Sequence, residues 1–171
     1  MFRGWDRPLV TPNYQNFGSI EDLEDVVCHI KANYPKAPLY LVGFSIGANL
    51  SVKYCGQKGE KSQVDGVVSI SNPFNVGAAS HQISSMKYAV YGNYMGKNLV
   101  EIAFKNRHQV SLIEKRKGIT LDWDRIAKCK NPLEFDQHFS MAILDNPTDL
   151  DSMYKALSCR DYIEKIPDIP V

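Results

Sequence analysis

The feature that most constrains the fold is a short apolar run that ends in a serine between two glycines. Residues 39–47 read Leu-Tyr-Leu-Val-Gly-Phe-Ser-Ile-Gly, so the run closes in the pattern Gly43-x-Ser45-x-Gly47. The pattern predicts a strand, a sharp turn with a strained serine at its tip, and a helix that begins at once: a nucleophile elbow. Glycine is expected at 43 and 47 because a β-carbon at either position would crowd the strand against the helix. An ordinary turn around a glycine-flanked serine is the alternative interpretation.

The segments around this turn alternate between helical and strand-like patterns. Apolar residues recur at helical spacing over 19–34, which predicts a helix with Ser19 as its N-cap. After a strand over 39–43, we expect a mostly buried helix from about 46 to 54, ended by Gly56 and Gly59, and a second strand over 64–71. Helix, strand, helix, strand in this order predicts a parallel sheet with right-handed crossovers, and hence an α/β fold.

The character of the chain changes after Pro73, where strand-like runs give way to short helical patterns. We expect a helical insertion over the carboxyl edge of the sheet, in the position of a lid. Its aromatic side chains either line an acyl-chain pocket or, as is more common, form the core of the insertion. The expected helices cover 80–91, 97–115, 121–129, 132–144 and 148–166. The aromatic residues are Tyr88, Tyr91, Tyr94, Phe104, Trp123, Phe135, Phe139 and Tyr154.

Composition excludes several classes of protein. A length of 171 residues suits one domain with its own core, and the net charge of +1 with scattered Lys and Arg argues against a nucleic-acid partner. There is no apolar run near 18 residues and no apolar signal segment, so we expect an intracellular protein, cytoplasmic or membrane-associated, without an anchor in this chain. The four cysteines lack metal-ligand spacing, which predicts reduced thiols and no metal or other cofactor.

Several motifs together resemble a known group of proteins. They are Phe2-Arg3-Gly4, Ser19-Ile20-Glu21-Asp22-Leu23, Pro35-x-x-Pro38-Leu39, the string from Val42 to Leu50, Leu133-Glu134-Phe135-Asp136 and Tyr154-Lys155-Ala156-Leu157-Ser158. This combination resembles AB-hydrolase family four of the α/β-hydrolase fold, which includes embryogenesis-associated proteins, YheT-like bacterial esterases and membrane-anchored acylglycerol and phospholipid lipases. The resemblance implies one partial α/β-hydrolase domain over residues 1–171. Residues 1–73 would be the sheet core with the elbow, 74–160 the helical cap, and 161–171 the lead into a following strand.

The resemblance also implies an activity and a site. Ser45 would be the nucleophile of a serine carboxylic ester hydrolase, the backbone N–H of Ile46 one oxyanion donor, and Gly43 and Gly47 the elbow glycines. The substrate would be a small-molecule ester or a lipid, and membrane contact follows only from the resemblance. Oligomeric state stays open.

The pattern of this group is incomplete in the sequence. Its members carry an oxyanion loop before the Phe-Arg-Gly segment and a catalytic acid and histidine after the next strand, so we expect a middle fragment with impaired activity. His138 follows Asp122, Asp124 and Asp136 and is a formal internal alternative, although a place in the cap favours a surface role for it.

Two hypotheses remain: a serine ester hydrolase, whole or remnant, and a catalytically inactive α/β-hydrolase-like module that binds a partner or ligand. A fluorophosphonate probe separates them because only an activated serine reacts.

Overall fold

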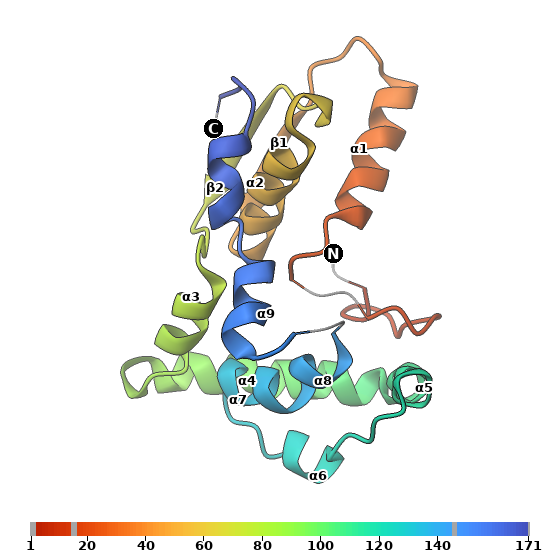
Figure 1. Ribbon diagram of the computed structural model, residues 1–171, viewed down its shortest axis with the longest axis vertical. Helices are drawn as coiled ribbons and strands as arrows, with labels where there is room; N and C mark the ends of the chain where they lie inside the picture. The colour runs from red at the N-terminus through yellow and green to blue at the C-terminus, as the bar shows by residue number, and fades with distance from the viewer. Residues whose placement is uncertain (1–2, 15–16, 145–146, 171) are drawn as a thin grey trace. The chain divides into compact units, whose positions relative to one another are not determined.

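A computed structural model of the chain describes residues 3–14, 17–144 and 147–170, which form two compact units. We name residues 17–76 and 154–170 the sheet unit, and residues 3–14, 77–144 and 147–153 the helical unit. Figure 1 shows the helices and strands of both. Phe2, in the first of the resemblance motifs, and Val171, at the end of the expected strand lead, lie outside the described residues.

The sheet unit is built on two parallel strands, β1 (Tyr40–Phe44) and β2 (Gly66–Ile70). Helix α1 (Glu21–Asn33) precedes β1, α2 (Ile46–Lys58) connects the strands, and the 3-10 turn η1 (Gly59–Lys61) follows α2. Parallel strands connected through a helix confirm the α/β class that the alternating pattern predicts. One detail was wrong: Ile20, and not Ser19, is the N-cap residue of α1, and no side chain caps that helix.

Helix α2 is the buried centre of the sheet unit, as its apolar sequence predicts. Every residue from Ala48 to Gly56 is buried. The helix does not end at Gly56, where a β-carbon would lie 2.1 Å from the carbonyl oxygen of Tyr162. Glycine at this position lets α2 pack closely against η4 (Arg160–Lys165). Gly59, with φ 54, is the C-cap residue.

One face of the sheet is covered by α2, and the other is largely exposed. Side chains alternate along each strand, so α2 packs on the face that contains Gly43 and Val67. The opposite face presents large apolar side chains that are 38–64% exposed: Tyr40, Val42, Phe44, Val68 and Ile70. An apolar patch of this kind is unusual on a stable monomer and promotes association.

The end of the chain runs beside β2. The Val67 N–H donates to the carbonyl oxygen of Pro170 over 2.8 Å. The expectation that residues 161–171 lead into a further strand remains a prediction.

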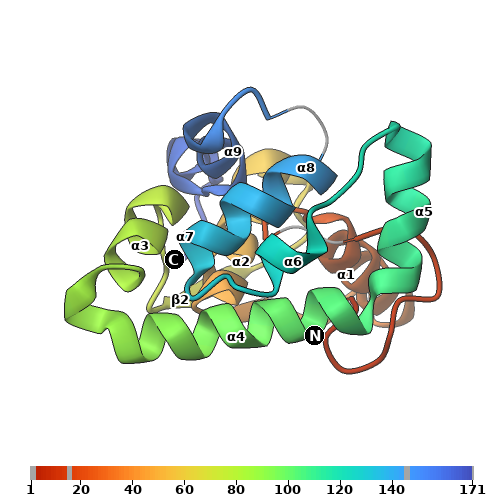
Figure 2. The ribbon, with the colours of Figure 1, turned by 90° about the horizontal axis from the view of Figure 1, so that it is seen from below.

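The helical unit contains short helices with one exception, the 17-residue α4. Figure 2 shows α4 lying along α7. The elements after β2 are α3 (Val76–Ile83), η2 (Met86–Tyr88), α4 (Ala89–Lys105), α5 (Arg107–Lys117), α6 (Trp123–Ile126), α7 (Pro132–Phe135), the π-turn η3 (Asp136–Ser140), α8 (Met141–Ile143) and α9 (Leu150–Leu157). Two unit boundaries fall within helices: Val76 of α3 and the residues of α9 from 154 onward belong to the sheet unit.

The helix expected over 97–115 is interrupted at Asn106, between α4 and α5. The Asn106 side chain is 1% exposed, accepts the Leu9 N–H over 2.7 Å and donates to the Gly4 carbonyl over 2.9 Å. Within the helical unit, these bonds attach residues 3–14 to the junction of α4 and α5. Sequence periodicity could not predict them because the partners are about a hundred residues apart.

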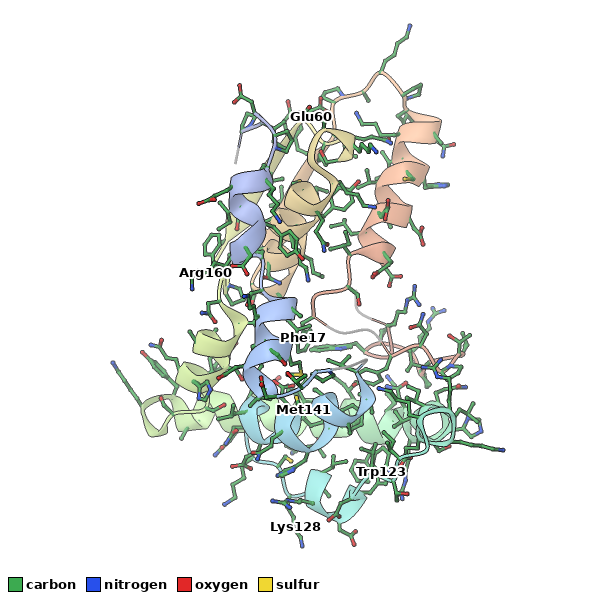
Figure 3. The ribbon with its side chains drawn as sticks, in the orientation of Figure 1. Phe17, Glu60, Trp123, Lys128, Met141 and Arg160 are labelled. Atoms are coloured by element: carbon green, nitrogen blue, oxygen red, sulfur yellow. The ribbon has the colours of Figure 1, made fainter. Side chains whose placement is uncertain are left out.

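Aromatic side chains form much of the core of the helical unit. Phe139 is fully buried and its ring contacts those of Tyr14, Trp123 and Phe135, with centroid distances of 5.3, 6.2 and 4.8 Å. Trp123 is labelled in Figure 3. Burial, with a smaller effect of the Asp136 charge, raises the pKa of Tyr14. The core interpretation therefore holds for this cluster.

Candidate active site

Ser45 lies directly between β1 and α2, at the carboxyl end of its strand. Its φ of 51° and ψ of −121° are outside the regions that non-glycine residues favour. The Ser45 N–H donates to the Ile70 carbonyl over 2.9 Å, which extends the pairing with β2 by one bond. A backbone of this kind costs about 1–3 kcal/mol and persists only where the surrounding structure enforces it. The strand–turn–helix geometry that the pattern predicts is therefore present.

The Ser45 side chain does not cap α2. A serine before a helix commonly accepts a backbone N–H of the first turn with its hydroxyl. Ser45 makes no such bond, although its carbonyl oxygen accepts the N–H groups of Ala48 and Asn49 at 3.0 and 3.1 Å. The residue is exposed, and its hydroxyl has no hydrogen-bond partner within the described ranges. The hydroxyl is therefore available to a ligand.

The two elbow glycines have different roles. A β-carbon on Gly43 would lie 2.5 Å from the Gly47 carbonyl oxygen and 2.6 Å from the backbone of Ala48. These distances are too short for any side chain, so glycine is required at 43. The prediction for Gly47 was wrong: apart from its own turn of helix, a β-carbon there would meet no described atom within 4 Å. The close approach occurs on the strand side because Gly43 faces the first turn of α2, whereas the space beside Gly47 is open.

Ile46 is the first residue of α2. The N–H groups at the start of a helix have no acceptor within the helix and lie at the positive end of its dipole. The Ile46 N–H therefore fits an oxyanion donor beside Ser45, and that role remains a prediction.

Asn49, which the sequence analysis did not single out, fixes the first turns of α2. It is fully buried, donates to the Leu157 carbonyl over 2.9 Å and accepts the Cys159 N–H over 2.8 Å. One turn later, Lys53 donates to the Ala156 carbonyl over 2.5 Å. Burial lowers the pKa of Lys53, an effect partly opposed by the charge of Glu21. The available signal was an amide and a charged side chain in the stretch from Ala48 to Cys55, which is otherwise mostly apolar.

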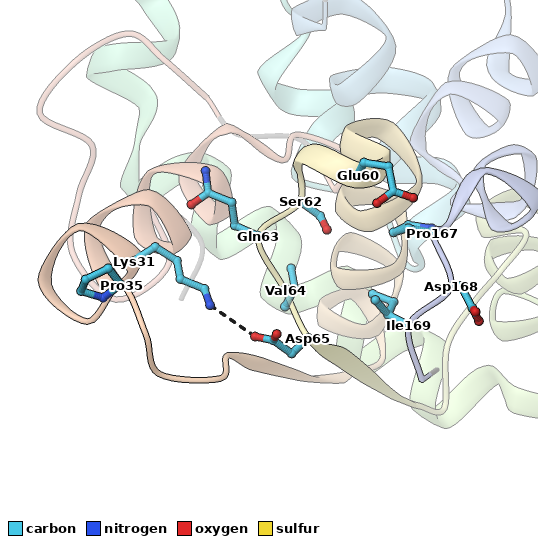
Figure 4. Close-up of a pocket in the computed structure, with 10 residues that line it drawn as sticks. All are labelled: Lys31, Pro35, Glu60, Ser62, Gln63, Val64, Asp65, Pro167, Asp168 and Ile169. Atoms are coloured by element: carbon cyan, nitrogen blue, oxygen red, sulfur yellow. Dashed lines mark hydrogen bonds and ion pairs between the residues drawn. The ribbon is translucent and has the colours of Figure 1, made fainter.

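A cavity of about 470 Å³ lies at the opposite end of the strands, shown in Figure 4. Lys31 and Asp65 line it, and their Nζ and Oδ2 atoms are 3.3 Å apart. Asp65 also accepts the Leu39 N–H over 2.7 Å, and this bond, followed by the one from Lys31, lowers the pKa of its carboxyl. These groups satisfy one another just before β1 and β2 begin, so the cavity belongs to the amino end of the sheet and not to Ser45.

The histidines are distributed over both units. His29 lies exposed on α1, where its backbone carbonyl accepts the Asn33 side chain over 2.7 Å. His138, Asp122, Asp124 and Asp136 belong to the helical unit, and Asp136 accepts the Ser140 hydroxyl over 2.6 Å. The internal acid and base remain a prediction. In the described ranges, no three His, Cys, Asp or Glu side chains are grouped as a metal site requires.

The sequence of the chain matches a known protein family. The profile of the family Hydrolase_4, described as serine aminopeptidase, S33, matches residues 11–131, which include the elbow. The chain belongs to this family. The resemblance to α/β-hydrolases is thereby confirmed.

Curated relatives of the chain include a phospholipase, an embryogenesis-associated protein and a lipase. The chain is 29% identical to phospholipase ABHD3 of Mus musculus over 95% of this chain and 38% of that protein. Embryogenesis-associated protein EMB8 of Picea glauca is 29% identical over 77% of the chain and 28% of its own length. The monoacylglycerol lipase of Saccharomyces cerevisiae is 28% identical over 63% of the chain and 24% of its own length. The chain therefore spans less than two fifths of each relative.

The remaining comparisons are negative. No solved structure matches the chain. Among the helices of the described ranges, none combines the length and apolar character needed to cross a membrane.

Proposed function

We propose that this chain is the nucleophile-bearing part of a serine carboxylic ester hydrolase of the acylglycerol lipase or esterase type. The observation that supports the proposal best is Ser45, which is exposed, strained and placed at the carboxyl end of a parallel strand, with a hydroxyl that does not cap α2. The Ser45 Oγ attacks the ester carbonyl carbon and loses its proton to a base. The alcohol then leaves with a proton, and water releases the acid from the acyl-enzyme. The Ile46 N–H stabilises the oxyanion.

The substrate class follows from the relatives. A phospholipase and a monoacylglycerol lipase are among them, so a lipid ester is the substrate we propose. The helical cap over residues 74–160 is part of this proposal because the family resemblance implies it, and its exposed aromatic side chains include Tyr91 and Tyr94. A cytoplasmic or membrane-associated location fits such a substrate.

We further propose that the 171-residue chain by itself turns esters over slowly. A serine hydroxyl is a poor nucleophile at neutral pH without a base. The acid and histidine that the family resemblance implies match no position of this sequence. Members of a catalytic triad act as a unit, so the loss of the base removes most of the benefit of the nucleophile.

Mass spectrometry of the chain after incubation with p-nitrophenyl butyrate tests this proposal. We expect a butyryl group to form slowly, over a long incubation, on the peptide that contains Ser45, with little continued release of p-nitrophenol. Ser45→Ala should abolish the adduct, and Ser111→Ala, which removes an exposed serine of the helical unit, should leave it unchanged.

Two results would change the proposal. A chain that never acquires the butyryl group would support the inactive binding module. Sustained turnover that disappears in Ser45→Ala would contradict the proposal that the chain turns esters over slowly. It would favour His138 as an internal base.

A further inference from the structure

The second strand ends as the first does, in a strained serine. Ser71 follows β2 with a φ of 53°, close to the 51° of Ser45. Of the non-glycine residues in the described ranges, three have positive φ, and the third is Gln63, which precedes β2. Each such residue stores about 1–3 kcal/mol of strain. Two of the three therefore lie at the same edge of the sheet.

The register places these two serines beside each other. Phe44 and Ile70 are the last pair of the two parallel strands, and Ser45 and Ser71 are the residues that directly follow this pair. The bond from the Ser45 N–H to the Ile70 carbonyl, 2.9 Å long, shows that the pairing extends to this point. Neighbouring strands are about 4.8 Å apart. A hydroxyl bonds a partner oxygen at about 2.7–2.8 Å, so one small ester group is within reach of both side chains.

The turn after β2 is held by bonds that do not involve the Ser71 hydroxyl. The Asn72 side chain donates to the Ser69 hydroxyl over 2.9 Å and contacts the sulfur of Cys159 at 3.6 Å. The Arg160 N–H donates to the Phe74 carbonyl over 3.2 Å. Arg160 is labelled in Figure 3. These contacts fix the backbone on both sides of Ser71.

Ser71 itself is exposed, and its hydroxyl bonds to no other residue of the described ranges. The side chain therefore contributes neither to the core nor to the turn. Glycine adopts positive φ without strain, so a serine here carries a cost that the fold does not require.

We propose that Ser71 is a substrate-binding residue whose hydroxyl donates a hydrogen bond to an oxygen of the ester held at Ser45. The inference rests on the proposed function of Ser45 and adds a second side chain to that site. The fixed turn holds the hydroxyl at the carboxyl edge of the sheet before substrate arrives, so little ordering cost accompanies binding.

Binding of a tetrahedral anion tests Ser71 without any need for turnover. The probe is the methyl monoester of butylphosphonic acid, which has the shape and charge of the ester intermediate but no leaving group. Its dissociation constant for the full chain is measured by ¹H–¹⁵N NMR titration. Ser71→Ala keeps the β-carbon and the strain but removes the hydroxyl, and we expect it to weaken binding about 3- to 10-fold, as for one hydrogen bond.

Two further variants separate the hydroxyl from the backbone. Ser71→Asn keeps a hydrogen-bond donor on a residue that tolerates positive φ and should retain most of the affinity. Gln63→Ala alters another residue of positive φ, at the amino end of the sheet, and should bind as the unchanged chain does.

Equal affinity of Ser71→Ala and the unchanged chain, or no binding of the phosphonate at all, would overturn the inference. Failure of the proposed function of Ser45 would give a different experimental result. In that case Ser45 never accepts a butyryl group, while the phosphonate still binds and still depends on Ser71.

Discussion

Replacement of Gly43 by alanine should destabilise the sheet unit much more than the same replacement at Gly47. The two glycines flank Ser45 symmetrically in the sequence, and each change adds one methyl group. In the structure, the new β-carbon at 43 would lie 2.5 Å from a carbonyl oxygen and 2.6 Å from two further backbone atoms of α2. At 47 it would meet no described atom within 4 Å beyond its own helix.

The magnitude follows from these distances. Contacts below 3.0 Å are not tolerated, so β1 and α2 must move apart by about half an ångström, although α2 is buried along nine consecutive residues. Overpacking of this kind costs about 1–3 kcal/mol, and three backbone clashes place Gly43→Ala near 3 kcal/mol. Gly47→Ala gains helix propensity, at most about 0.5–1 kcal/mol in favour of the folded state. For a chain of this size, Gly43→Ala should lower the melting temperature by roughly 6–12 °C.

Urea unfolding followed by circular dichroism measures both variants against the unchanged chain. Hydrogen exchange of the α2 amides shows whether the loss occurs where the clash lies. A Gly43→Ala chain as stable as the original, or a Gly47→Ala chain destabilised to the same extent, would refute the close approach of β1 and α2.

The remaining predictions concern the sheet unit. Asn49→Leu leaves the Leu157 carbonyl and the Cys159 N–H without partners, so urea titration should show a loss of about 2–4 kcal/mol. Burial raises the pKa of Cys55 from 9.0 to about 11. Between these pH values the folded state keeps the thiol proton that the unfolded state has lost, so the free energy of unfolding falls as pH rises. The urea midpoint of Cys55→Ala should therefore fall less steeply over that pH range than the midpoint of the unchanged chain. Phe44→Thr should reduce binding of an apolar dye because Phe44 is 64% exposed, and an unchanged signal would contradict an open sheet face.

The sequence predicted the elements around Ser45 well because their signals are local. An apolar run before Gly43 and a serine two residues later determine a strand, a turn and a helix within about twenty residues. The second strand is a continuous apolar run with the same property. Each of these elements is at its expected place, with no end shifted by more than four residues.

The contacts that hold the site in place are not local, and the sequence did not reveal them. Asn49 is 108 residues from the carbonyl that it bonds, and Lys53 is 103 residues from its own. The open space beside Gly47 and the close contact at Gly43 depend on how β1 and α2 pack. The strain at Ser71 depends on how the turn after β2 is held by residues 158–160. Such features require the assembled packing.

Labelling of the full chain with a fluorophosphonate, followed by peptide mapping, tests the identity of the nucleophile most directly. The reagent forms a stable bond only with an activated serine oxygen. We predict slow labelling that is concentrated on the peptide containing Ser45 and is absent from Ser45→Ala. Labelling spread evenly over other exposed serines, or none at Ser45 after long incubation, would contradict the assignment of Ser45 as the nucleophile.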